Sequence, residues 1–255
     1  MALETFMEAA RLVFPYLRVQ GIRDAQFTEV IEVPPEVAIM SYITCRRRGQ
    51  EDGRVVCELT METPLVSPTG RVLEKKALNY RSQVILGAGI SPSWLDLPDF
   101  PVNLEELDSR SAEIEEIFAW YGKHTDMQGR YRVVGHLDGS GPGVVRGSGT
   151  FKITRDFTHV QTSTFQYSPY ILESLMQMTS FFLKMRNEED ERTVIPVGIG
   201  ELLVGRQCRE QEVIIMEARL RTEDKKGMTW DAQALDAEGK ILMQVKDLRM
   251  RWFSE

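Results

Sequence analysis

The chain has 255 residues, of which 42% are hydrophobic and 27% are charged, a composition typical of a soluble globular protein with an adequate core. Its formal net charge of -7 argues against a surface for nucleic acids or anionic membranes. The three cysteines lack the CxxC spacing of a metal or redox site, so we expect reduced thiols in a cytoplasmic protein. No stretch approaches the roughly 20 apolar residues of a membrane span, and no secretory signal is predicted at the N-terminus.

The first half of the chain predicts one helix followed by an antiparallel meander. Residues 2–14 place apolar side chains at helical spacing, and Pro15 ends this helix. The basic run Arg46–Arg48, with the GQEDGR that follows it, is interpreted as a solvated hairpin turn, with contact to an acidic partner as the alternative. The β-rich runs around it, between about residues 19 and 86, are AQFTEVIEV, EVAIMSYITC, GRVVCELTMETPLV and RVLEKKALNYRSQVIL.

The second half repeats this order of elements. Residues 111–122 (SAEIEEIFAWYG) predict a short helix, and strands around a glycine-rich turn follow it. A long apolar helix is predicted over residues 169–186. The strand candidates after this helix are TVIPVGIGELLVG, EVIIMEARLR, GMTWDAQALD and KILMQVKDLRMRWF.

A long apolar helix wrapped by a curved antiparallel sheet is the hotdog arrangement, and two such units in tandem predict an α+β double hotdog. A helix enclosed by a sheet has little surface exposed to water, which explains why the helix at 169–186 is apolar around most of its circumference near its start. The predicted units span residues 1–88 and 113–255, joined by a linker at 89–112. We expect them to pack as a pseudo-dimer with both helices enclosed.

Glu173 raises the main chemical question. Its helix carries a polar stripe, spaced by four, three and four residues, that consists of Glu173, Gln177, Ser180 and Lys184. A solvent-facing stripe is the simpler interpretation, and periodicity favours it by roughly two to one. The alternative is a carboxyl group in an apolar pocket, whose pKa burial would raise so that it could act as an acid near neutral pH. The residues by themselves leave both interpretations open.

Other candidates for chemistry give weaker signals. His124 falls in a predicted loop, and His136 and His159 fall in strand-like segments; none belongs to an HxxxH or HExxH pattern, so no metal site is predicted. The GSGPG run at 139–143 has no helix after it and predicts a turn rather than a phosphate cradle. No GxSxG elbow is present, and we expect no cofactor.

The helix at 169–186 also resembles a known motif. The stretch Pro169-x-Ile171-Leu172-Glu173-Ser174-x-x-Gln177 is similar to the PxLLDxxxQ helix of polyketide synthase dehydratase domains, in which an aspartate works with a histidine from the other hotdog. Glu173 stands at the aspartate position, and single-hotdog fatty-acid dehydratases also use a glutamate. Four further segments resemble segments of the family and occur in the same order: MALETFMEAA, MQGRYRVV, VIPVGIGELLVG and VKDLRMRWF. Dehydratase domains of polyunsaturated fatty acid synthases are similar as well.

The resemblance implies loss of water from a β-hydroxyacyl thioester, carried by phosphopantetheine on an acyl carrier protein. A histidine would remove the α-proton, Glu173 would protonate the departing hydroxyl, and Gln177 would hydrogen-bond and orient Glu173. Further expected partners are neighbouring synthase domains and a second copy of the chain, but no nucleic acid. The residues implied to contact the substrate are Gln177, Tyr131, Pro169, Pro196 and Gly198.

The family's catalytic histidine lies in an HxxxGxxxxPG motif just before the first helix, and this chain begins where that motif ends. None of His124, His136 and His159 stands at that position. We therefore expect the 255-residue chain to dehydrate thioesters poorly while still binding acyl chains, and an upstream histidine to restore turnover. The alternatives are an inactive acyl-binding or scaffolding domain, and a hotdog isomerase or thioesterase.

Overall fold

The structure is a computed structural model that describes residues 2–29, 31, 39–67, 69–89, 107, 115, 118–119, 134–151, 167, 169–186, 192–209 and 211–253. In this part of the chain, no helix is both long enough and apolar enough to cross a membrane. The elements, in chain order, are α1 (Ala2–Val13), β1 (Arg18–Phe27), β2 (Tyr42–Glu51), β3 (Arg54–Val66), β4 (Val72–Gly87), β5 (His136–Gly141), β6 (Val144–Thr150), α3 (Pro169–Arg186), β7 (Thr193–Val204), β8 (Val213–Glu223), β9 (Gly227–Asp236) and β10 (Ile241–Phe253).

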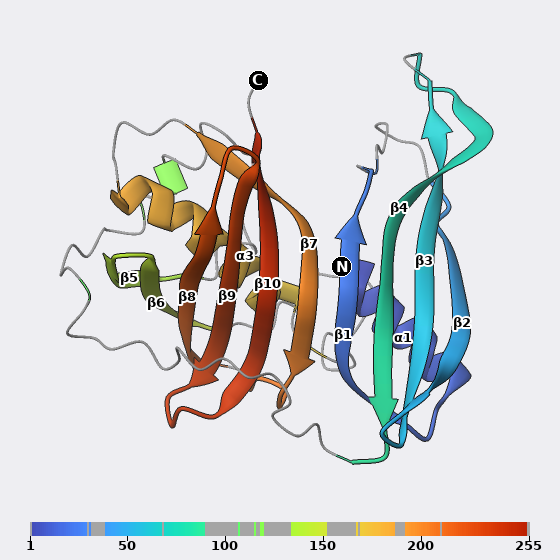
Figure 1. Cartoon of the computed structure of the whole chain (residues 1–255), viewed down its shortest axis with the longest axis horizontal. Coiled ribbons are helices and arrows are strands. Elements are labelled where there is room, and N and C mark those ends of the chain that lie inside the picture. The colour runs from blue at the N-terminus through green and yellow to red at the C-terminus, as the bar shows by residue number, and fades with distance from the viewer. Residues whose placement is uncertain are drawn as a thin grey trace.

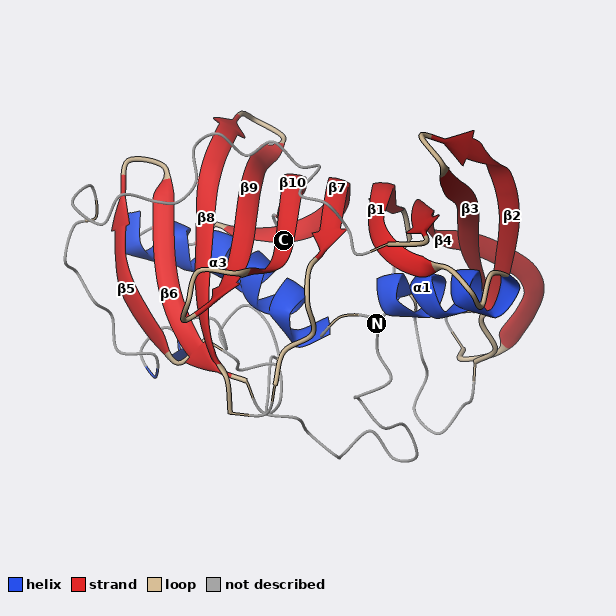
Figure 2. Cartoon of the chain, turned by 90° about the horizontal axis from the view of Figure 1, so that it is seen from below, coloured by secondary structure: helices blue, strands red, loops and turns tan. Residues whose placement is uncertain are grey.

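All of these strands form a 10-stranded sheet in the order β2-β3-β4-β1-β7-β10-β9-β8-β6-β5. Every pairing between neighbours is antiparallel, including the β1–β7 pairing that joins the two halves. Helix α1 contacts β1–β4 and helix α3 contacts β5–β10, and both helices lie on the same side of the sheet (Figures 1 and 2). The predicted α+β double hotdog is confirmed.

The two helices are covered to different extents. In α3, Leu175, Met178 and Phe181 are fully buried, and the Phe182 ring packs edge-to-face on Trp230 of β9 with 5.0 Å between ring centroids. Helix α1 buries only one face, and its last turn leaves Leu12 83% exposed. The expected enclosure therefore holds for α3 but not for the end of α1, because α3 has six strands over it and α1 has four.

The first half also departs from prediction in where its strands begin and end. Strand β1 covers Arg18–Phe27 rather than residues 25–33, and Arg46–Arg48 lie inside β2 rather than in a turn. The reversal occurs at Asp52 and Gly53, whose φ angles of 47° and 76° fit the two-residue turn that hairpins favour. Strand β2 therefore continues through the arginines, and its position at the edge of the sheet leaves their charges in water.

The second half follows its predicted elements closely. Helix α3 and strand β9 have the predicted bounds, and β7 and β10 agree within one residue. Of the predicted helix at 111–122, residues 115, 118 and 119 are helical and the others lie outside the described residues. Most of the predicted linker at 89–112 also lies outside them, so the division into units at 1–88 and 113–255 stays a prediction.

Replacing Gly227 with alanine should destabilise the sheet. A Cβ at Gly227 would collide with the Met250 carbonyl oxygen and would lie 2.9 Å from Arg251 Cα, so only a backbone shift could make room. We expect Gly227→Ala to lower the free energy of unfolding by about 1–3 kcal/mol in urea denaturation. Gly49→Ala is the matched control, because nothing lies within 4 Å of its Cβ position. Equal stability of the two variants would contradict this packing.

Candidate active site

A cavity of about 360 Å³ is lined by the first turns of α1 and α3. Figure 2 shows that these two helix ends approach each other. Both halves of the chain contribute to its wall: α1, the end of β1 and β4 from the first, and α3, β7 and β10 from the second. Most of the wall is apolar, as is usual for pockets that bind small molecules. Its principal apolar side chains are Leu3, Phe27, Leu172, Met176, Ile195 and Pro196.

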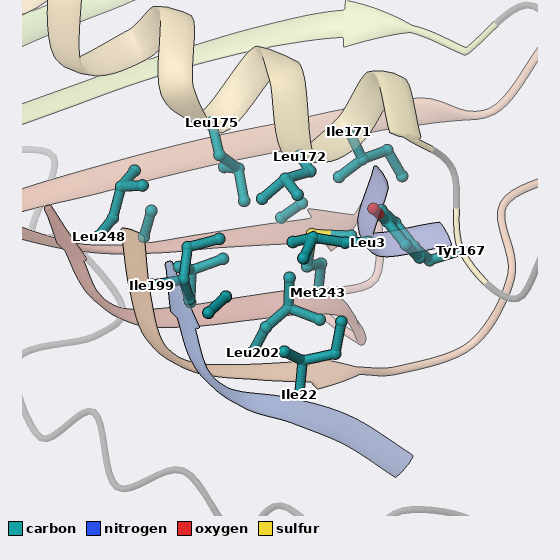
Figure 3. Close-up of a cluster of buried hydrophobic side chains, with 14 of the residues drawn as sticks. Leu3, Ile22, Tyr167, Ile171, Leu172, Leu175, Ile199, Leu202, Met243 and Leu248 are labelled. Carbon is teal, nitrogen blue, oxygen red and sulfur yellow. The ribbon is translucent and has the colours of Figure 1, made fainter. Parts of the chain in front are cut away.

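A buried hydrophobic cluster holds the two helix ends in place next to this cavity. Figure 3 shows Leu3 of α1 and Leu172 of α3 pointing toward the same cluster. On the sheet side, the cluster includes Ile22 of β1 and Leu202 of β7, whose backbones are paired. Since core side chains from both halves interlock here, packing fixes the positions of the helix and strand walls of the cavity.

Glu173 lies in the second turn of α3 and lines the cavity. Gln177, one turn further on, donates a hydrogen bond from Nε2 to Glu173 Oε1 at 3.3 Å. Burial raises the pKa of the Glu173 carboxyl because it penalises the charged form, while the hydrogen bond from Gln177 acts in the opposite direction. The result is a carboxyl group that keeps its proton to higher pH than an exposed glutamate does.

The solvent-facing stripe is the wrong interpretation of this helix. Gln177 and Ser180 are both 0% exposed, and Lys184 is half-buried. The sheet curves so far around α3 that the polar positions are covered along with the apolar ones. Glu173 alone of these four reaches the cavity.

The predicted site residues are brought together only in part. Pro169, the first residue of α3, and Pro196 of β7 line the cavity with Glu173, and Gln177 lies behind Glu173. Gly198 is not among the cavity-lining residues: a Cβ there would lie 2.6 Å from the Ala25 carbonyl oxygen, so strand packing requires this glycine. Tyr131 lies outside the described residues.

The histidines contribute nothing to this cavity within the described part of the chain. His136 lies in β5 at the far edge of the sheet, exposed, with Nε2 3.7 Å from Asp138 Oδ1. His124 and His159 lie outside the described residues. Among the residues that are described, no group of three His, Cys, Asp or Glu side chains could hold a metal ion.

The cavity has further polar groups that the sequence did not single out: Tyr80 of β4, Arg251 of β10, Glu29 after β1, and Tyr167 before α3. Tyr167 is buried, its backbone N–H donates to Glu4 Oε2 at 3.4 Å, and burial raises the pKa of its phenol. No motif marks these residues, because they are far apart in sequence and lie among ordinary strand and turn residues. Only the closure of the sheet brings them to one cavity.

One family model matches more than half of the chain. The family model for the polyketide synthase dehydratase N-terminal domain matches residues 99–255. No curated protein sequence matches the chain.

Solved structures with the same fold cover nearly the whole chain. The dehydratase domain from the CurF module of curacin polyketide synthase has 18% identity and a TM-score of 0.74 over 99% of this chain and 83% of its own. An inactive CurK dehydratase mutant with an aspartate replaced by asparagine has 17% identity and a TM-score of 0.69, covering 99% and 84%. The dehydratase domain of PpsC from Mycobacterium tuberculosis, in complex with C12:1-CoA, has 14% identity and a TM-score of 0.70, covering 99% and 83%.

Removing the charge of Glu173 should stabilise the fold at neutral pH. Because the folded-state pKa is raised, the folded chain binds more protons than the unfolded chain between the usual glutamate pKa and the raised one, so stability falls as pH rises through that window. We expect Glu173→Gln to raise the free energy of unfolding at pH 8 and to change it little at pH 4, in urea denaturation. Glu74→Gln, at an exposed position, should have no such pH dependence. A pH-independent effect at position 173 would mean that this carboxyl is not desolvated.

Proposed function

Because the chain belongs to the polyketide synthase dehydratase family, we propose that its cavity removes water from a β-hydroxyacyl thioester carried on an acyl carrier protein. The observation that carries this proposal is the Glu173 carboxyl, desolvated in the cavity wall and hydrogen-bonded by Gln177 at 3.3 Å. General acids work best when their pKa lies near the operating pH, and burial moves this carboxyl in that direction. The inactivity of the CurK variant with an asparagine for an aspartate supports the need for a carboxyl group in such domains.

In the proposed reaction, Glu173 acts on the leaving oxygen. A base takes the α-proton, and the electrons of the C–H bond form the double bond between the α and β carbons. The bond between the β carbon and the hydroxyl oxygen breaks, and that oxygen takes the proton of Glu173 and leaves as water. Glu173 is then a carboxylate, which the Gln177 amide stabilises until a proton returns from the protonated base or from water.

The base in this proposal is the histidine of the family motif that precedes the first helix. Helix α1 begins beside the cavity, since Ala2 and Leu3 line it together with Glu173. A histidine on residues just before α1 would therefore stand across the substrate from the acid. The inactive binding-domain alternative is not favoured, and the hydrogen bond between Gln177 and Glu173 supports the proposal of an acid with an orienting amide.

The wider setting is also a proposal. The acyl-CoA bound to PpsC supports an acyl thioester as ligand, and the exposed cation Arg251 at the cavity is suited to the phosphate of a phosphopantetheine arm. We place the chain in the cytoplasm, in polyketide or fatty acid biosynthesis, beside neighbouring synthase domains and with a homodimer as its assembly. Units at 1–88 and 113–255 would each supply one wall of the site.

Glu173→Gln should abolish most turnover, because an amide cannot donate a proton to a leaving hydroxide. In a protein that carries the family's histidine motif ahead of α1, we expect kcat for a β-hydroxyacyl thioester to fall about 10²–10⁴-fold, measured by the absorbance of the enoyl product. Glu173→Asp should retain much more activity, since it keeps the acid. In the unaltered protein, kcat should fall as pH rises through the raised pKa of Glu173.

Glu74→Gln is the matched control and should leave kcat unchanged, because this glutamate is exposed on β4 and away from the cavity. Turnover that is indifferent to Glu173→Gln would show that another group is the acid.

A further inference from the structure

We propose that the Tyr80 hydroxyl is a substrate-binding group that donates a hydrogen bond to the thioester carbonyl oxygen of the acyl substrate. This inference rests on the proposed function, since it assumes an acyl thioester in the cavity. It concerns a residue of the first half of the chain, in β4, whereas Glu173 and Gln177 come from α3 of the second half.

Strand pairing directs the Tyr80 side chain toward the cavity. Tyr80 pairs with Met61 of β3 and Phe27 of β1, and Met61 is buried in the same core cluster as side chains of helix α1, which places it on the helix-facing side of the sheet. Paired residues in an antiparallel sheet point to the same face, so Tyr80 faces the helices as well. It lines the same cavity as Glu173 and stays partly exposed there.

The ring of Tyr80 packs on a neighbouring aromatic ring, and the strand that carries it is anchored at the adjacent residue. It packs edge-to-face on Phe27, with 5.6 Å between the ring centroids and 68° between the planes. The neighbouring residue Asn79 is buried and anchors the strand: its Oδ1 accepts from Thr63 Oγ1 at 2.9 Å, and its backbone oxygen accepts from Thr28 Oγ1 at 3.0 Å. A ring held this way loses little conformational freedom when a ligand binds.

The Tyr80 hydroxyl is available to a ligand. None of the described residues hydrogen-bonds it. The hydroxyl of the other cavity phenol, Tyr167, also has no hydrogen-bond partner, but it is buried away from solvent, whereas Tyr80 stays partly exposed. Burial raises the pKa of Tyr80, so the phenol keeps its proton at neutral pH and acts as a donor to an oxygen acceptor.

The two oxygens of a β-hydroxyacyl thioester match the two groups in the cavity. Glu173 projects from the helix side of the cavity and, in the proposed function, serves the β-hydroxyl. Tyr80 projects from the sheet side, where its hydroxyl can donate a hydrogen bond to the thioester carbonyl oxygen. A donor to this carbonyl orients the thioester and also favours the negative charge that builds on the oxygen when the α-proton leaves.

A pair of ligands that differ only in the carbonyl oxygen tests this inference. Butyryl pantetheine has the thioester carbonyl, and S-butyl pantetheine, a thioether, lacks it; neither can be dehydrated. We expect Tyr80→Phe to weaken binding of butyryl pantetheine about 3- to 10-fold in isothermal titration calorimetry, the loss for one hydrogen bond. Binding of S-butyl pantetheine should not change, because the interaction is specific to the pair of groups.

Tyr16→Phe is the matched control, because this tyrosine is 95% exposed and does not line the cavity. It should bind both ligands as the unaltered protein does. If Tyr80→Phe weakens both ligands equally, the residue contributes packing alone and the inference is wrong; if it weakens neither, the hydroxyl does not meet the carbonyl and the inference is also wrong. Loss of turnover in Glu173→Gln together with either result would leave the proposed function intact. Failure of the unaltered protein to bind butyryl pantetheine would overturn both.

Discussion

Hydrogen bonding between β1 and β7 makes a single sheet of the strands from both halves, and the cavity depends on this pairing. Its register runs from Gly21 opposite Leu203 to Gln26 opposite Gly198. Beyond that last pair, the next residues on each strand, Phe27 and Val197, line the cavity. The site therefore lies where the two halves stop sharing backbone hydrogen bonds, and the space between them is closed by side chains from both helices.

In the apolar wall of this cavity, the carboxyl group of Glu173 is kept by two compensating effects. Taking a carboxylate out of water is costly, and a group in that position either finds a partner or keeps its proton. Both apply to Glu173: Gln177 donates one hydrogen bond to its carboxyl group, and burial raises the pKa of that group. Under the proposed function, stability and chemistry therefore oppose each other at this residue, because the burial that would make it an effective acid also costs stability.

The helices and strands of the second half were predictable because the local helix and strand patterns agree with the burial that the sheet imposes. Pro169 opens α3, and most of the apolar residues after it are buried by the sheet. In the first half the signals conflict. Arg46–Arg48 suggested a turn by their charge, but the positive-φ pair at Asp52 and Gly53 makes the reversal later, and the edge of the sheet tolerates the arginines.

The sequence by itself determined the order of elements, the bounds of α3 and the one-turn spacing of Glu173 and Gln177, because these follow from local periodicity and chain stereochemistry. Whether that glutamate faces water or a cavity was undecided at that level, since a polar stripe on a helix looks the same in either case. The tertiary structure decided it by curving six strands around α3. It also brought Tyr80 and Arg251 to the same cavity, which no spacing could have shown, because strand closure joins residues that are distant in the chain.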